Sequence, residues 1–159
     1  MELSDRVIEI FKAIAQVPRQ SKHEAKISAW LADRAKSSGF EVERDDANNV
    51  IIRVPATKGY ENAPIIALQG HMDMVCEKNN DVEHNFDTDP IEVIIEGDWM
   101  HANQTTLGAD DGLGVALALA MAEDPNVEHP RLEIIITSDE ETGMTGAIAL
   151  KPESVQARI

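Results

Sequence analysis

The architecture is most clearly indicated by one segment, Ile65-Ile66-Ala67-Leu68-Gln69-Gly70-His71-Met72-Asp73. Its first four residues are apolar on both faces and too few for a helix, which predicts a buried central strand. The strand then runs through Gly70 into His71 and Asp73, where polar side chains begin. Ligands gather beyond the carboxyl ends of strands in open α/β sheets, so the same stretch predicts where a site lies.

Helical and extended patterns alternate on either side of this strand. Apolar residues at helical spacing predict a first helix from Leu3 to Ile14, and Ser21-Lys22-His23-Glu24 resembles a capping box that starts a second helix. A second run that is apolar on both faces, 132–137, predicts another buried strand. The remaining pattern predicts hairpins over 40–54 and 91–102, a polar loop over 77–90, and helices over 112–122 and 143–150. We therefore expect an α/β fold, with a mixed, largely parallel sheet sandwiched by helices.

The composition limits the class of protein. The 159 residues suffice for one compact domain, and 14 basic against 29 acidic side chains give a formal net charge of −15. This charge argues against nucleic acid and anionic membrane surfaces as partners, because both are bound through clustered Lys and Arg. Cys76 is the only cysteine, which excludes an intrachain disulfide and a cysteine-rich zinc site. The first residues lack the pattern of a signal peptide, so we expect a cytoplasmic protein.

Three groups of potential metal ligands follow or precede the apolar segments: His71-Met72-Asp73, Asp110-Asp111 and Asp139-Glu140-Glu141. Each has an ordinary alternative: a loop histidine near a turn aspartate, a helix N-cap, and the acidic first turn of a solvated helix. The glycines around Asp110 also allow a phosphate-binding loop, but no lysine follows them.

Taken together, the three groups predict a metal-assisted hydrolase. Carboxylate oxygens with an imidazole suit zinc, manganese or cobalt better than copper(I). Two metal ions about 3.5–4 Å apart, bridged by a carboxylate, form a known hydrolytic arrangement. If the carboxyl ends of the two apolar strands lie at one edge of the sheet, the three groups meet there.

Longer runs around these groups resemble the co-catalytic zinc exopeptidases of the aminopeptidase/aminoacylase superfamily, and within it the Xaa-His dipeptidases. The similar runs are 70–78, 105–112 and 137–143, and the likeness extends to Pro18-Arg19-Gln20-Ser21. The resemblance implies two divalent metal ions, most commonly zinc, with manganese or cobalt as alternatives. It implies hydrolysis of dipeptides of the Xaa-His type, with β-alanyl-histidine as an example. A second reading is an N-acyl amino acid deacylase with the same two-metal centre.

The resemblance also implies a role for individual residues. His71 and Glu141 would be metal ligands, and Asp110 would bridge the two ions. Glu140 would be the general base that activates water, and Asp73 would orient and polarise His71. The peptide bond between Asp110 and Asp111 would be cis.

On the same grounds, residues 1–159 are expected to be the N-terminal part of a catalytic metallopeptidase domain. In the superfamily a further acidic ligand, a lid domain used for dimerisation, and a late metal-binding histidine follow in sequence. The resemblance therefore implies a homodimer for a full-length protein. It also implies that the 159 residues by themselves are inactive, so a non-catalytic fragment is a third reading.

Overall fold

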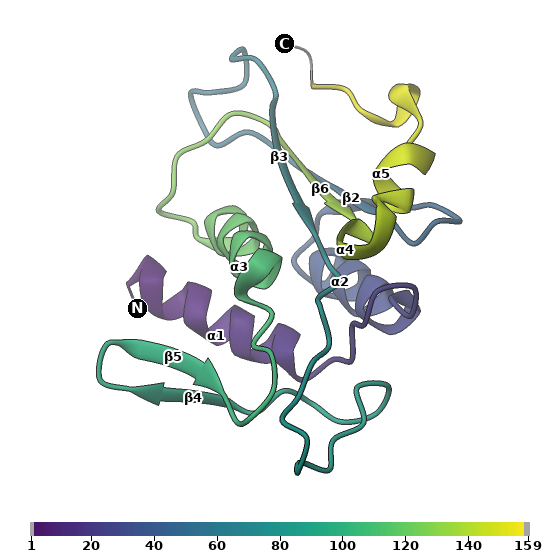
Figure 1. Ribbon diagram of the computed structural model, residues 1–159. Helices are drawn as coiled ribbons and strands as arrows, with labels where there is room; N and C mark the ends of the chain where they lie inside the picture. Colours follow the sequence, from purple (N-terminus) through teal and green to yellow (C-terminus); the bar gives the residue numbers. More distant parts are fainter. Residues whose placement is uncertain (1, 158–159) are drawn as a thin grey trace.

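The computed structural model describes residues 2–157, which are built around a four-stranded sheet (Figure 1). The strands are β1 (Glu41–Arg44), β2 (Val50–Val54), β3 (Ile66–His71) and β6 (Leu132–Thr137), and they lie in the order β1-β2-β6-β3. β2 pairs antiparallel with β1 and with β6, whereas β3 pairs parallel with β6. All four strands were predicted from their apolar or alternating patterns.

The sheet confirms the mixed α/β class and corrects two details of the prediction. Only one of its three pairings is parallel, so "largely parallel" is wrong for this part of the chain. The short turn at 45–49 returns β2 antiparallel to β1, and β2 then lies beside β6. β3, expected in the centre, is an edge strand within residues 2–157, and Ile66 is 46% exposed there.

Three helices cover one face of the sheet: α1 (Leu3–Ala15), α2 (Ala25–Ser37) and α3 (Ala109–Glu123). Their apolar stripes pack on alternate residues of the two central strands, because side chains two apart along a strand point to the same face. None of the helices within residues 2–157 has the length and apolarity needed to cross a membrane. The sheet residues of this core are Val50, Ile52, Val54, Leu132, Ile134 and Ile136.

The other face is covered by the C-terminal segment, which contains α4 (Glu140–Gly143), α5 (Thr145–Ala149) and the 3-10 turn η1 (Pro152–Ser154). Figure 1 shows α5 and α3 on opposite sides of the strands. Polar contacts attach this segment to the sheet: Arg53 donates to the Ser154 carbonyl, and the buried Glu133 accepts the Gln156 amide at 2.8 Å. The sheet is thus covered by helical segments on both faces, as predicted.

The connection from β3 to β6 positions the site. It contains the hairpin β4 (Val93–Glu96) and β5 (Trp99–Ala102), followed by α3. Because β3 and β6 are parallel neighbours, their carboxyl ends lie at the same edge of the sheet. The start of α3 reaches this edge too, since the Asp111 carboxylate accepts the backbone N–H of His71.

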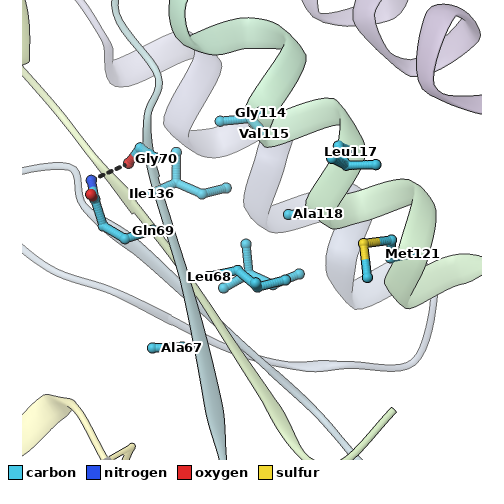
Figure 2. Close-up of a pocket in the computed structure, with 11 residues that line it drawn as sticks. Ala67, Leu68, Gln69, Gly70, Gly114, Val115, Leu117, Ala118, Met121 and Ile136 are labelled. Carbon is cyan, nitrogen blue, oxygen red and sulfur yellow. Dashed lines mark hydrogen bonds between the residues drawn. The ribbon is translucent and has the colours of Figure 1, made fainter. Parts of the chain in front are cut away.

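An apolar cavity lies between β3 and α3, along the side of β3 that has no strand partner within residues 2–157 (Figure 2). Leu117 on α3 is 44% exposed beside it. The cavity lies on the flank of the sheet, and Gly70 and Gly114 at one end of it adjoin the Asp111 carboxylate. Side chains that line it include Ala67, Leu68, Leu117, Ala118 and Met121.

Candidate metal centre

His71 lies at the centre of the polar cluster beyond the strand ends. It is the last residue of β3 and is 7% exposed. Its Nε2 lies 3.1 Å from Asp110 Oδ1 and 3.9 Å from Glu140 Oε2, and its Nδ1 lies 3.3 Å from Asp73 Oδ1. The Asp73 contact is an ion-pair approach rather than a well-aligned hydrogen bond. One imidazole thus meets carboxylates from three separate segments.

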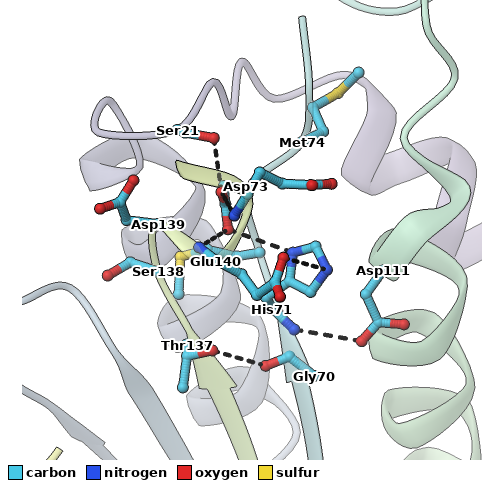
Figure 3. A network of polar contacts seen from close by, with 12 residues as sticks. Ser21, Gly70, His71, Asp73, Met74, Asp111, Thr137, Ser138, Asp139 and Glu140 are labelled. Atoms are coloured by element: carbon cyan, nitrogen blue, oxygen red, sulfur yellow. Dashed lines mark hydrogen bonds and ion pairs between the residues drawn. The ribbon is translucent and has the colours of Figure 1, made fainter. Parts of the chain in front are cut away.

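Asp73 joins the end of β3 to the loop after β6 (Figure 3). Its carboxylate is fully buried and accepts the backbone N–H groups of Glu140 at 3.0 Å and Glu141 at 3.2 Å. It also accepts the Ser21 hydroxyl at 2.7 Å. Because the same carboxylate faces His71 Nδ1, it fixes the position of the imidazole ring and of the backbone of the two glutamates.

The two aspartates in the first turn of α3 have different surroundings. The Asp110 side chain is 87% exposed and faces His71 Nε2, whereas Asp111 turns back and accepts the His71 backbone N–H at 3.3 Å (Figure 3). Both have non-helical backbone angles, and the peptide bond between them is cis, as the resemblance implied. Burial raises the pKa of Asp111. Asp111 therefore ties α3 to β3, and Asp110 is the one open to a ligand.

The residues of the third cluster, Asp139-Glu140-Glu141, also differ in their surroundings. Asp139 is buried in a left-handed conformation, and its carboxylate accepts the hydroxyls of Thr142 and Thr145. Glu140 and Glu141 follow it at the start of α4 and are partly exposed. Burial raises the pKa of Glu141, which the positive charge of His71 opposes. Asp139 therefore shapes the turn, and the two glutamates face the cluster of carboxylates.

The residues fit a divalent metal ion. Ligand atoms of His71, Asp110 and Glu141 lie within 4.8 Å of one another, and these are the three residues predicted to bind metal. Imidazole with carboxylate oxygens is a donor set suited to zinc, manganese or cobalt. A second group, Glu24, Asp73 and Asp139, is equally close, but its members are buried and accept hydrogen bonds from the protein.

In the metal-free protein, the His71 imidazole is protonated at neutral pH. The Asp73 carboxylate, 3.3 Å from Nδ1, raises the pKa of His71 to about 9, against the effect of burial. Burial works against ionisation of Asp73, but His71, the amides of Glu140 and Glu141 and the Ser21 hydroxyl lower its pKa to about 2. The positively charged imidazolium of His71 then lies among carboxylates. A bound metal ion would stabilise the same negative groups, and it would have to displace this proton.

The predicted capping box at 21–24 is wrong, and its residues serve the site instead. α2 begins at Ala25 without a side-chain cap, and Ser21 donates to Asp73. Glu24 is buried and accepts the backbone N–H of Lys22 at 2.8 Å and of Asp139 at 2.9 Å. The local pattern could not distinguish these roles, because Asp73 and Asp139 lie far along the chain.

Asn49 is a further site-supporting residue that sequence reasoning did not single out. Its buried amide donates to the Gly146 carbonyl at 2.8 Å and accepts the Ser138 backbone N–H at 3.1 Å. It therefore attaches the turn between β1 and β2 to both sides of the α4 segment. An Asn-Asn pair in a predicted turn was the only signal.

Several similar proteins carry the names of peptidases. A chain named cytosol non-specific dipeptidase from Escherichia coli (strain K12) is 48% identical over 151 residues, covering 95% of this chain and 31% of its own length. The crystal structure of aminoacylhistidine dipeptidase from Vibrio alginolyticus has a TM-score of 0.94 at 40% identity, over 100% of this chain and 33% of that one. Aminopeptidase PepT from Bacillus cereus ATCC 10987 has a TM-score of 0.77 at 30% identity, over 96% of this chain and 41% of that one.

These relatives are longer than the chain, which spans about a third of the first two. Residues 67–157 match peptidase family M20/M25/M40. This range holds His71, Asp110 and Glu141, the three potential ligands that the fold brings together. Because the match covers more than half of the sequence, this chain belongs to peptidase family M20/M25/M40.

Proposed function

We propose that this chain supplies part of the catalytic centre of a metal-dependent dipeptidase, as the N-terminal part of its catalytic domain over residues 1–159. The observation that carries the proposal is the approach of His71, Asp110 and Glu141, whose ligand atoms lie within 4.8 Å of one another. Glu140 Oε2 lies beside them, 3.9 Å from His71 Nε2. A histidine, two carboxylate ligands and a free carboxylate are groups of the kind that metal-assisted hydrolysis uses.

Each residue has a defined task in this proposal. His71, Asp110 and Glu141 would hold two divalent ions, zinc in the first place, with Asp110 between them. Bound ions would polarise the substrate carbonyl and activate water. Glu140 would accept the proton of the attacking water on its carboxylate and return it to the leaving amine. Asp73 would hold the His71 ring through Nδ1, so that Nε2 faces the metal.

Exposure supports these assignments. The side chains of Asp110 and Glu140 are 87% and 41% exposed, so ions and substrate can reach both. Asp73 is inaccessible and has its oxygens occupied by donors, which suits a supporting role.

For the substrate we propose dipeptides, with Xaa-His as the preferred type. The similar proteins carry the names non-specific dipeptidase and aminoacylhistidine dipeptidase, which agree on dipeptides and differ on the second residue. An N-acyl amino acid deacylase with the same centre is the second candidate, since the groups near the metal act on the scissile carbonyl alone. We also propose a cytoplasmic location and, for a full-length protein, a homodimer, with no nucleic acid or membrane partner.

The test has two arms, because the relatives are about three times as long as this chain. Zinc binding is measured by calorimetry on the chain itself, for the natural sequence and for His71→Asn. Hydrolysis is measured on a chimera in which this chain replaces the matching third of the Escherichia coli relative. β-Alanyl-histidine, other dipeptides and N-acetyl amino acids are compared as substrates.

We expect zinc binding that His71→Asn abolishes, and dipeptide hydrolysis by the chimera that falls about 10²–10⁴-fold with Glu140→Gln while zinc remains bound. Glu83→Gln, a neutralised carboxylate in the polar loop, is the matched control and should leave the rate unchanged. Preference for N-acetyl amino acids would favour the deacylase. A chimera that binds zinc but cleaves none of these compounds would contradict both, and support the non-catalytic reading.

A further inference from the structure

Arg19 is a buried arginine whose position the proposed chemistry does not explain. It lies between α1 and α2 and is 2% exposed. Within the described part of the chain, its side-chain hydrogen bonds go only to backbone carbonyls, and its Nε has no partner. Burying a charge without a carboxylate partner is costly, so such a group persists where it makes specific contacts. Burial lowers its pKa to about 10, which leaves it charged at neutral pH.

The carbonyls that Arg19 contacts belong to two different loops. Nη1 donates to Met72 O at 3.1 Å and to Asp73 O at 3.2 Å, in the loop after β3. Nη2 donates to Gly108 O, in the loop before α3. The guanidinium is rigid and planar, so it sets the distance between the two loops that its two ends contact. His71 is adjacent to the first contact, and Asp110 is two residues from the second.

The loop before α3 is shaped to admit this guanidinium. A Cβ atom at Gly108 would collide with Arg19 Nη2, and one at Gly112 would lie 2.8 Å from the same nitrogen. Gly108 also has a φ of +69°, which favours glycine. The two glycines on either side of Asp110 and Asp111 therefore leave the space that the arginine fills.

The first loop is held by other bonds as well. Arg19 O accepts the Met74 backbone N–H at 3.1 Å, and the Ser21 hydroxyl reaches Asp73. Both bonds remain when the side chain of Arg19 is replaced.

The second loop has ties on either side of Gly108, where the Thr106 hydroxyl donates to the Val75 carbonyl at 2.7 Å and the Asp111 carboxylate accepts the His71 N–H at 3.3 Å. Among the described residues, the Gly108 carbonyl between them is linked to another segment only through Arg19. Removal of the guanidinium should therefore release the Gly108 loop and leave the 72–74 loop in place.

We propose that Arg19 is a positioning residue for the metal centre, which holds the Asp110 loop at a set distance from His71. The proposal rests on the metal centre proposed above. Arg19 touches neither the potential ligands' side chains nor a substrate, and acts through the backbone of Met72, Asp73 and Gly108. The affinity for metal then depends on a residue that is remote in sequence from all three ligands.

The experiment compares Arg19→Met and Arg19→Lys with the natural chain. Arg34→Met is the control, because Arg34 is an arginine with a 21% exposed side chain that pairs with a carboxylate, Glu123 at 2.7 Å, and not with loop carbonyls. Zinc affinity is measured by calorimetry, and the visible spectrum of the Co²⁺-loaded chain reports the coordination geometry. Amide hydrogen exchange is measured on the metal-free chains at 72–74 and 108–112, and global stability by urea unfolding.

We expect Arg19→Met to weaken zinc binding by about 10–100-fold and to change the Co²⁺ spectrum. Amide hydrogen exchange of the metal-free variant should be faster than in the natural chain at 108–112, and much less affected at 72–74. Arg19→Lys, with one ammonium group in place of the two-ended guanidinium, should fall between. Arg34→Met should lose global stability without a selective change in either the zinc affinity or the exchange at 108–112.

Zinc affinity and exchange at 108–112 that match those of Arg34→Met would overturn the proposal. If Arg19→Met does not fold, the test rests on Arg19→Lys. A zinc affinity and an amide hydrogen exchange at 108–112 equal to those of the natural chain would then count against a positioning role for Arg19. If the natural chain binds no zinc, the proposed metal centre fails. The exchange comparison then still shows whether Arg19 holds the loop.

Discussion

At the scale of single residues, the pair His71–Asp73 determines how the site responds to pH. The two groups stabilise each other's charged forms, and Asp73 also accepts two backbone amides and a hydroxyl. Such a pair has two consequences for a metal-free protein: it stabilises the fold over a limited pH window, and it keeps a proton where a metal ligand is needed.

The stability window follows from the direction of the two shifts. The folded-state pKa of His71 is raised from 6.5 to about 9, so its stabilisation is complete below about 6.5 and is lost as pH rises through about 9. That of Asp73 is lowered from 3.8 to about 2, so its contribution is lost only as pH falls through that range. Urea unfolding with a chelator present should show the free energy of unfolding decreasing between pH 6.5 and 9.

His71→Asn should remove this decrease, since the titrating group is then absent. Zinc affinity of the natural chain should rise over the same interval, because the metal must displace the imidazole proton. A flat stability profile in the natural chain, or one unchanged in His71→Asn, would refute the assignment of the shift.

At the scale of elements, the short α4–α5 segment matters because it carries Glu140 and Glu141. Its attachment depends on a close backbone approach at Gly146. A Cβ atom there would collide with the Ser138 carbonyl and lie 2.6 Å from Asn49 Oδ1. Gly143, three residues earlier, has open space, with Thr145 Cγ2 at 3.8 Å as its nearest contact.

Gly146→Ala should therefore destabilise the chain by about 1–3 kcal/mol, the usual cost of forcing an extra methyl group into a packed region. Gly143→Ala is the control and should change stability by no more than about 0.5 kcal/mol. Urea unfolding at one pH measures both. Equal effects of the two substitutions would mean that the close approach at Gly146 does not hold the segment.

At the scale of the whole molecule, the open side of β3 is an exposed apolar edge. Within residues 2–157 this strand has a partner on one side only, and Ile66 and Leu117 are 46% and 44% exposed near it. Unpaired edge strands with apolar side chains promote association, and natural proteins block them with charges.

The 159-residue chain should consequently self-associate with rising concentration, as sedimentation velocity can show. Ile66→Lys should reduce this association, because the edge then carries a charge. Ile148→Lys is the control: Ile148 is 78% exposed but belongs to α5, on the opposite side of the strands from α3, so its replacement should have little effect. Similar loss of association in both variants would point to general apolar contacts and not to the strand edge.

The sequence by itself determined the elements and the chemical groups of the site. The apolar runs at 65–68 and 132–137 and the helical stripe of α1 are local patterns, because burial on one face or two leaves a periodicity that neighbouring residues reveal. His71, Asp110 and Glu141 were identified by residue type, position at element ends and resemblance, and the fold brings these three together. Their roles as ligands remain predictions.

Only the tertiary structure decided the order of the strands and the partners of buried polar groups. Nothing local to β2 indicates that it lies between β1 and β6, or that β3 is at the edge. Ser21 and Glu24 matched a helix cap, yet they bond to Asp73 and Asp139, and Arg19 fills the space left by Gly108. A buried polar group bonds to whichever donor or acceptor the fold places within reach, and here the partners are 52 to 115 residues apart in the sequence.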